Sequence, residues 1–109
     1  MKKITVIFPT EREELVKEKL YHLDIGGLLI SHITGLGMLR GTEKQKEKKY
    51  FEQTKTKLEI IVTNPAAEIA VKILTDCLQT GKTGDGKIYI SPVDDIIRIK
   101  TGEHGPVAV

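Results

Sequence analysis

The hydrophobic positions of this 109-residue chain fall into short extended stretches and longer helical stripes. Five stretches are rich in β-branched and other apolar residues and predict strands at 3–8, 28–33, 58–62, 88–90 and 96–99. Two segments, 10–24 and 64–79, repeat apolar residues every three or four positions, which predicts amphipathic helices. This order, with a short terminal extension, predicts one α+β domain over residues 1–109 with a ferredoxin-like βαββαβ sandwich.

Local signals predict where both helices begin. Thr10 and Glu13 have the spacing of a capping box, in which the threonine caps the helix and the glutamate reaches back to the threonine amide. Asn64 precedes Pro65, and asparagine favours the cap position while proline favours the first helical position. The glycine pair at 26–27 predicts the end of the first helix.

A polar segment separates the second predicted strand from the third. Residues 42–49 contain no apolar period, so we expect a mobile loop at about 38–55. Loops of this length are unusual in so small a domain and are often functional. We also expect a loosely held C-terminal tail at about 102–109.

Composition narrows the classes of function. The 17 basic and 15 acidic residues give a net charge of +2, which does not favour nucleic acid as a partner. No apolar run approaches the ~20 residues of a membrane span. The single cysteine, Cys77, excludes an internal disulfide and a multi-cysteine zinc site, so a reducing cytoplasm is the expected compartment. No histidine and carboxylate set has metal-ligand spacing, so no metal site is predicted.

The strongest chemical signal is the glycine-rich segment 80–87, Thr-Gly-Lys-Thr-Gly-Asp-Gly-Lys. Three glycines in six residues let several backbone amides converge on an anion, and Lys87 adds a positive charge. The spacing matches a P-loop, but Ile88 follows where a P-loop has a hydroxyl, and the context is helix-loop-strand. We therefore predict phosphate binding without a Walker-type NTPase. The alternative is a glycine-rich turn that only connects a helix to a strand.

A second signal is the pair of cations Arg98 and Lys100. In a strand over 96–99, alternation would place both side chains on one face, where an anion could lie between them. The alternative is a solvated outer face.

Together, the segments 80–91, 97–103, 1–4 and 27–37 resemble the nitrogen-regulatory PII signalling family along nearly the whole chain. The resemblance implies a ferredoxin-like homotrimer that binds ATP or ADP, with AMP as a further candidate, in clefts between subunits. Many members also bind 2-oxoglutarate beside Mg-ATP. The resemblance further implies that the chain is not an enzyme: its nucleotide state reshapes a long loop that docks on a partner protein.

The resemblance assigns a role to each matching position. Segment 84–87 matches the phosphate loop and Arg98 a phosphate-binding arginine, while Lys100 stands where an arginine is usual, so bidentate geometry is lost. Met38 replaces another usual arginine. The implied nucleotide-binding residues are Ile7, Gly35, Gly37, Met38, Glu59, Val62, Gly84, Asp85, Gly86, Lys87, Arg98 and Lys100. Glycines 35 and 37 and Glu59 match positions around the adenine and the loop base, and Ile7 and Val62 match apolar packing for the base.

The chain departs from the family at Leu39, where the 2-oxoglutarate site has a glutamine that helps to coordinate magnesium. Leucine offers no oxygen to a hard cation, so magnesium binding is left open. Lys55 matches the lysine that meets the oxoglutarate carboxylate, which together with Gly41 outlines a second anion site. We expect 2-oxoglutarate sensing to be weak or absent. The loop is also about three residues shorter than in familiar members.

Three functions remain open at this point. The first is an adenine-nucleotide sensor that regulates an ammonium or bicarbonate transporter, or a metabolic enzyme, without inserting into the membrane. The second is an enzyme that slowly hydrolyses ATP in the same cleft. The third is a trimer that has lost ligand binding, against which the retention of segment 84–87 and Arg98 argues.

Overall fold

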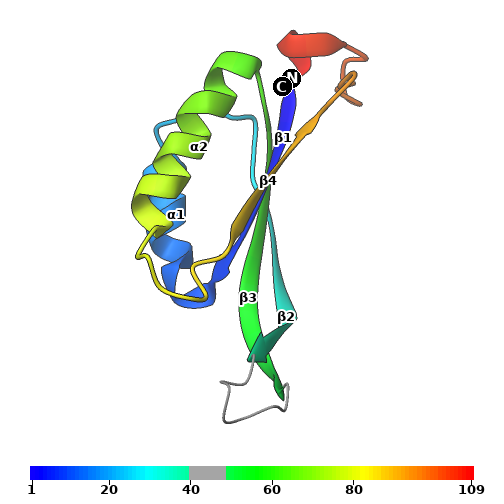
Figure 1. The fold of residues 1–109 in the computed structure, drawn as a ribbon. Coiled ribbons are helices and arrows are strands. Elements are labelled where there is room, and N and C mark those ends of the chain that lie inside the picture. The colour runs from blue at the N-terminus through cyan, green and yellow to red at the C-terminus, as the bar shows by residue number, and fades with distance from the viewer. Residues whose placement is uncertain (40–48) are drawn as a thin grey trace.

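The computed structural model describes residues 1–39 and 49–109, which form one antiparallel sheet with two helices on one of its faces (Figure 1). The strand order is β2-β3-β1-β4. The elements in chain order are β1 (Lys2–Pro9), the 3-10 turn η1 (Thr10–Arg12), α1 (Glu13–Leu20), β2 (Leu29–Leu39), β3 (Lys49–Val62), α2 (Asn64–Leu78), β4 (Lys87–Pro92) and the 3-10 turn η2 (Gly105–Ala108). The predicted ferredoxin-like α+β fold is confirmed. None of the described helices is long and apolar enough to cross a membrane.

The core lies between the sheet and the helices. Alternate residues Ile4, Val6 and Phe8 of β1 point into it, because a strand turns successive side chains to opposite faces. The other buried core residues are Val16, Leu20, Leu58, Ile60, Val62, Ala67, Ala70, Leu74 and Leu78. The opposite face of the sheet carries no helix in Figure 1, and Leu29 and Tyr89, whose register places them on that face, are largely exposed.

Strands β2 and β3 are longer than predicted. Their ladder continues to the pair Leu39 and Lys49, so the described parts of the expected loop at 38–55 are strand. Residues 40–48, which include Gly41, lie outside the described residues. The prediction missed these parts because residues 52–57 are all polar and the glycines at 35 and 37 interrupt the apolar pattern of β2. Backbone hydrogen bonds hold the ladder there.

The predicted capping box is wrong. Helix α1 begins at Glu13 after η1, and neither Thr10 nor Glu13 caps it through a side chain. The Glu13 carboxylate turns instead to β2 and β3. The helix also ends at Leu20, before the predicted end at Asp24. Helix α2 spans Asn64–Leu78 as expected, although Thr63 takes the cap position.

The predicted strand at 96–99 is also wrong. Only Ile97 forms a bridge, with His104, and the chain then turns tightly where the Gly102 N–H donates to the Arg98 carbonyl at 2.7 Å. Gly102 has φ +73°, which glycine adopts at low cost and which ends any extended run. Lys100 therefore lies in a turn, and strand alternation does not place it on the same face as Arg98.

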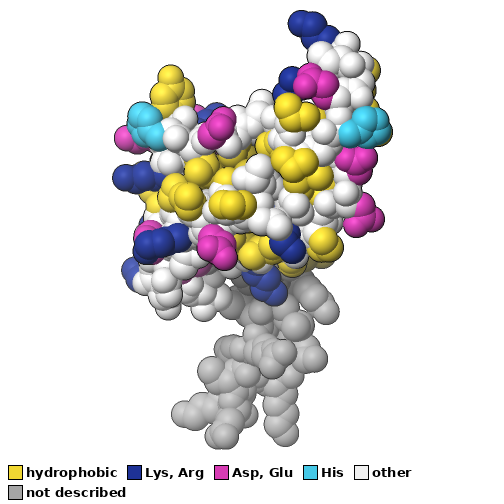
Figure 2. Space-filling view, turned by 90° about the horizontal axis from the view of Figure 1, so that it is seen from above, with side chains coloured by type: hydrophobic (Ala, Val, Ile, Leu, Met, Phe, Trp, Pro, Cys, Tyr) yellow, Lys and Arg dark blue, Asp and Glu magenta, His cyan; other side chains and the backbone are white. Residues whose placement is uncertain are grey.

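The C-terminal tail folds back on the domain and ends in η2. Ala108 is buried, and a Cβ added at Gly26 would lie 2.9 Å from the Val109 carbonyl carbon, so the last residues pack closely on the chain after α1. Figure 2 shows hydrophobic side chains grouped across the end of the molecule seen from above, between charged side chains at its rim. Among the exposed hydrophobic residues of this C-terminal segment are Ile97, Ile99 and Val107.

Candidate functional site

The glycine-rich segment forms a turn between α2 and β4 that its own aspartate organises. The Asp85 carboxylate accepts hydrogen bonds from the Thr80 N–H at 2.7 Å, the Gly81 N–H at 3.0 Å and the Thr80 hydroxyl. These hydrogen bonds, the Thr80 hydroxyl first, lower the pKa of Asp85 below its ordinary value, so the group stays charged. Gly81 and Gly84 have φ of +79° and +98°, which few side chains tolerate.

Gly86 fixes where this turn meets the sheet. A Cβ at Gly86 would lie 1.9 Å from the carbonyl oxygen of Ile7, and its φ is +111°. Only glycine therefore lets the turn lie against the end of β1. Lys87 follows as the first residue of β4 and pairs with Ile7 in the sheet. The structure thus brings together Ile7 and the predicted phosphate loop.

Lys55 contacts the same turn from β3. Its Nζ donates a hydrogen bond to the Gly84 carbonyl at 2.9 Å. The two residues line a surface hollow of about 460 Å³ together with Pro9, Glu11, Gln53, Thr54 and Thr83. The pairing joins positions 29 residues apart and carries no local sequence signal, so sequence reasoning placed Lys55 only at a second anion site.

Arg98 and Glu59 line a second hollow, of about 450 Å³, whose other lining residues include Gly27, Leu29, Ile61, Ala108 and Val109. The Arg98 guanidinium lies 3.4 Å from Glu103 Oε1 and donates to the Val107 carbonyl at 3.2 Å. The side chain is thus held by the C-terminal segment. Glu59 lies on β3 with the Lys57 ammonium 3.2 Å from its carboxylate.

The glycine-rich turn and Arg98 lie beyond opposite ends of β4, and Glu59 pairs with Thr5 between them. Strand β4 begins at Lys87 beside the glycine-rich turn and ends at Pro92, roughly 17 Å further along at the usual rise of a strand. Figure 1 shows the turn that precedes β4 near the lower ends of the helices and the C-terminal turn at the other end of the sheet. Arg98 and Lys87 of one chain are therefore separated by the length of β4.

The remaining predicted residues lie on β2 and β3. Gly35 lies on β2, paired with Gln53, whereas Val62 is in the core with 0% of its surface exposed and offers no side-chain surface to a base. Gly37 and Met38 belong to β2, but the Met38 side chain lies outside the described part of the chain. Within residues 1–39 and 49–109, no group of three or more histidine, cysteine, aspartate or glutamate side chains could hold a metal ion.

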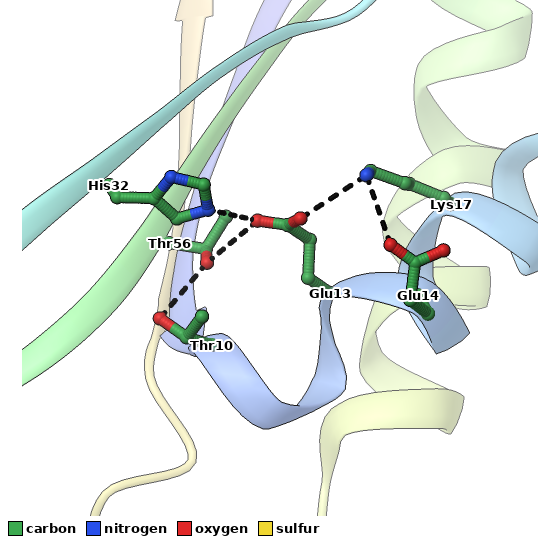
Figure 3. A network of polar contacts seen from close by, with 6 residues as sticks. All are labelled: Thr10, Glu13, Glu14, Lys17, His32 and Thr56. Carbon is green, nitrogen blue, oxygen red and sulfur yellow. Dashed lines mark hydrogen bonds and ion pairs between the residues drawn. The ribbon is translucent and has the colours of Figure 1, made fainter.

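A polar network at the start of α1 was not predicted (Figure 3). The Glu13 carboxylate lies 2.5 Å from His32 Nε2, 3.1 Å from the Thr56 hydroxyl and 3.2 Å from Lys17 Nζ. The Thr56 hydroxyl is 3.2 Å from that of Thr10. Because these donors favour the charged carboxylate, above all His32, the pKa of Glu13 is lowered. The network fastens α1 to β2 and β3 where the long ribbon leaves the body.

Comparison with known proteins gives one consistent family. The sequence model described as "Nitrogen regulatory protein P-II" matches residues 1–103. The chain is 37% identical to the nitrogen regulatory protein P-II of Synechocystis and 34% identical to that of Azospirillum brasilense, with 100% of both chains covered in each case. It is 38% identical to nitrogen regulatory protein P-II 1 of Methanothermobacter thermautotrophicus, of which it covers 97%.

Solved structures give the same result. GlnK of B. subtilis superposes with a TM-score of 0.85 at 27% identity, over 99% of this chain and 97% of that one. A B. subtilis GlnK-ATP complex matches with the same TM-score and identity, over 99% and 94% of the two chains.

Proposed function

Since the chain belongs to the nitrogen regulatory protein P-II family, we propose that it is a homotrimeric regulator that binds ATP or ADP between its subunits. Its nucleotide state acts on a partner protein of nitrogen or carbon metabolism through the segment at about 38–55. An ammonium or bicarbonate transporter and a metabolic enzyme are the candidate partners. The protein acts in the cytoplasm. It is a regulator rather than an enzyme.

The observation that carries this proposal is the separation of the two clusters. Gly84 and Lys87 lie at the start of β4, while Arg98 and Glu59 line a separate hollow. A cyclic trimer joins two different patches of neighbouring subunits, so one turn can meet the next subunit's Arg98. The exposed apolar residues on the helix-free face, Leu29 among them, supply surface for such an interface.

The chemistry of the combined site suits an adenine nucleotide. The backbone of the glycine-rich turn and Lys87 meet the phosphates, and the neighbour's Arg98 adds a planar cation suited to phosphate oxygens. Glu59 can accept a hydrogen bond from the amino group of an adenine ring, and Ile7 provides an apolar surface. The solved GlnK-ATP complex is consistent with this choice of ligand.

One departure and one contact argue for a sensor of adenine nucleotides alone. Leu39 supplies no magnesium ligand where the family's 2-oxoglutarate site needs a glutamine. Lys55, the other group of that site, donates to the Gly84 carbonyl. The response to 2-oxoglutarate is therefore weak or absent.

Titration calorimetry with ATP, ADP and AMP, each with and without magnesium and 2-oxoglutarate, tests the proposal. We expect adenylate binding that 2-oxoglutarate leaves unchanged, with up to three sites per trimer. A protein that binds none of the three nucleotides would contradict the proposal. Steady phosphate release from ATP that Lys87→Ala abolishes would favour the alternative, an ATP-hydrolysing enzyme.

A further inference from the structure

We infer that Lys55 is a positioning residue that orients the backbone of the glycine-rich turn for phosphate, an inference that rests on the proposed nucleotide site. The contact is between the Lys55 ammonium and the Gly84 carbonyl oxygen, 2.9 Å apart. Lys55 lies on β3, paired with Pro9 and Ile33, so its Cα is held on both sides by the sheet. Its side chain is half-buried against the turn.

The contact acts on the peptide group that joins Gly84 and Asp85. A trans peptide is planar, and its carbonyl and N–H point in opposite directions. When Lys55 holds the Gly84 carbonyl, the N–H of Asp85 must point away from Lys55. The hydrogen bond thus sets the direction of an amide in the predicted phosphate loop.

The turn needs such a restraint because glycine does not supply one. Gly84 is at φ +98° and has no side chain, so its flanking peptides rotate at low cost. Rotation of the Gly84–Asp85 peptide would present a carbonyl oxygen, which repels phosphate, where an amide should lie. A charge-assisted hydrogen bond from an ammonium opposes that rotation.

Among the described residues, other contacts fix the turn on either side of this peptide, and Lys55 holds the peptide itself. The Asp85 carboxylate holds Thr80 and Gly81, and Gly86 is pressed against Ile7. These contacts set the position of the turn. The contact from Lys55 comes from β3, which begins at Lys49, so the glycine-rich turn and that strand are linked.

Lys55→Met tests this role, because methionine keeps a long apolar stem and donates no hydrogen bond. Lys82→Met is the matched control: it removes the same charge from the turn itself and keeps the Lys55 contact with Gly84. We expect Lys55→Met to weaken ATP binding at least tenfold in calorimetry and Lys82→Met to change it less than threefold. Lys55→Arg, which keeps a donor, should recover part of the affinity.

Hydrogen exchange of the nucleotide-free protein separates positioning from direct contact. We expect amides at 83–87 to exchange faster in Lys55→Met than in the wild type and in Lys82→Met. Lost ATP affinity without faster exchange would mean that Lys55 touches the nucleotide directly and would overturn the inference, as would unchanged affinity or an equal loss in Lys82→Met. If the wild type binds no nucleotide, the proposed function fails, while the exchange comparison still decides whether Lys55 holds the turn.

Discussion

His32 on β2 and Glu13 in the first turn of α1 form a hydrogen-bonded pair, with His32 Nε2 2.5 Å from Glu13 Oε1. The carboxylate is mostly covered, with 14% of the side chain exposed, and it also receives Lys17 and the buried Thr56 hydroxyl. A carboxylate with this many donors is stabilised as the anion. We therefore expect the attachment of α1 to the sheet to depend on pH.

Glu13→Gln should reveal this dependence. The folded pKa of Glu13 is lowered from an ordinary value of 4.5, so its contribution is present above pH 4.5 and is lost as pH falls through the folded pKa. We expect urea unfolding to show Glu13→Gln less stable than wild type at pH 7, with a gap that shrinks below pH 4.5. A gap that stays constant from pH 7 to pH 3 would contradict this expectation.

Gly86→Ala should be far more disruptive than Gly81→Ala. Both glycines have positive φ, which costs another residue about 1–2 kcal/mol. The Gly86 Cβ would also lie 1.9 Å from the Ile7 carbonyl, whereas a Cβ at Gly81 meets nothing within 4 Å. We expect Gly86→Ala to lower the free energy of unfolding by about 1–3 kcal/mol more than Gly81→Ala does. Equal losses for both variants would show that the turn moves freely away from β1.

Lys87→Ala should lower ATP affinity about 10- to 150-fold, the range expected for a lost hydrogen bond to a charged group. Lys72→Ala is a suitable control, because Lys72 lies exposed on α2 and pairs with Asp76. Substitutions within 42–48 should leave ATP affinity intact and weaken docking of the regulated protein. If calorimetry finds wild-type ATP affinity in Lys87→Ala, the glycine-rich turn is not part of the nucleotide site.

Mixed trimers should test whether the site is shared between subunits. Homotrimers of Lys87→Ala and of Arg98→Gln should each bind ATP weakly. Subunits mixed after unfolding and refolding should regain one site of wild-type affinity per mixed trimer, where an intact turn meets an intact Arg98. Calorimetry that finds no recovered site in verified mixed trimers would place Lys87 and Arg98 in separate sites.

Leu39→Gln should introduce a response to 2-oxoglutarate. In the wild type we expect the ATP affinity with magnesium to be the same with and without 2-oxoglutarate, because leucine has no oxygen for the cation. The glutamine variant should bind ATP more tightly when 2-oxoglutarate is present. A wild-type protein whose ATP binding is already sharpened by 2-oxoglutarate would show that Leu39 is no obstacle.

The fold was predictable where burial left an apolar period. Alternation at Ile4, Val6 and Phe8 marked β1 correctly because one face of that strand packs on the helices. The same reasoning failed for the far parts of β2 and β3, where two glycines and the polar run at 52–57 leave no apolar period. It also failed at 96–99, where the conformation of Gly102 turns the chain and local alternation of Arg98 and Lys100 misleads.

The site was predictable only in its local part. The glycines at 81, 84 and 86 stand out in the sequence, and all three adopt the positive φ that glycine permits. The sequence pattern does not reveal that Asp85 folds the turn through its own carboxylate, or that Lys55 reaches Gly84 from another strand. The sequence pattern does not reveal the Glu13 network either, because the spacing between Thr10 and Glu13 fits a helix cap equally well.

The register of β3 has a consequence for how this protein can vary in length. Lys55 and Thr56 are neighbours in the sequence but serve opposite faces, one holding the glycine-rich turn and the other buried beside Glu13. Because β1 holds Lys55 and Thr56 in register, loss or gain of a single residue between Lys49 and Lys55 would shift only the part of the ribbon before the change by one step against β2. Insertions and deletions among relatives should therefore gather between Leu39 and Lys49, where a change of length leaves the pairing of β2 with β3 in register.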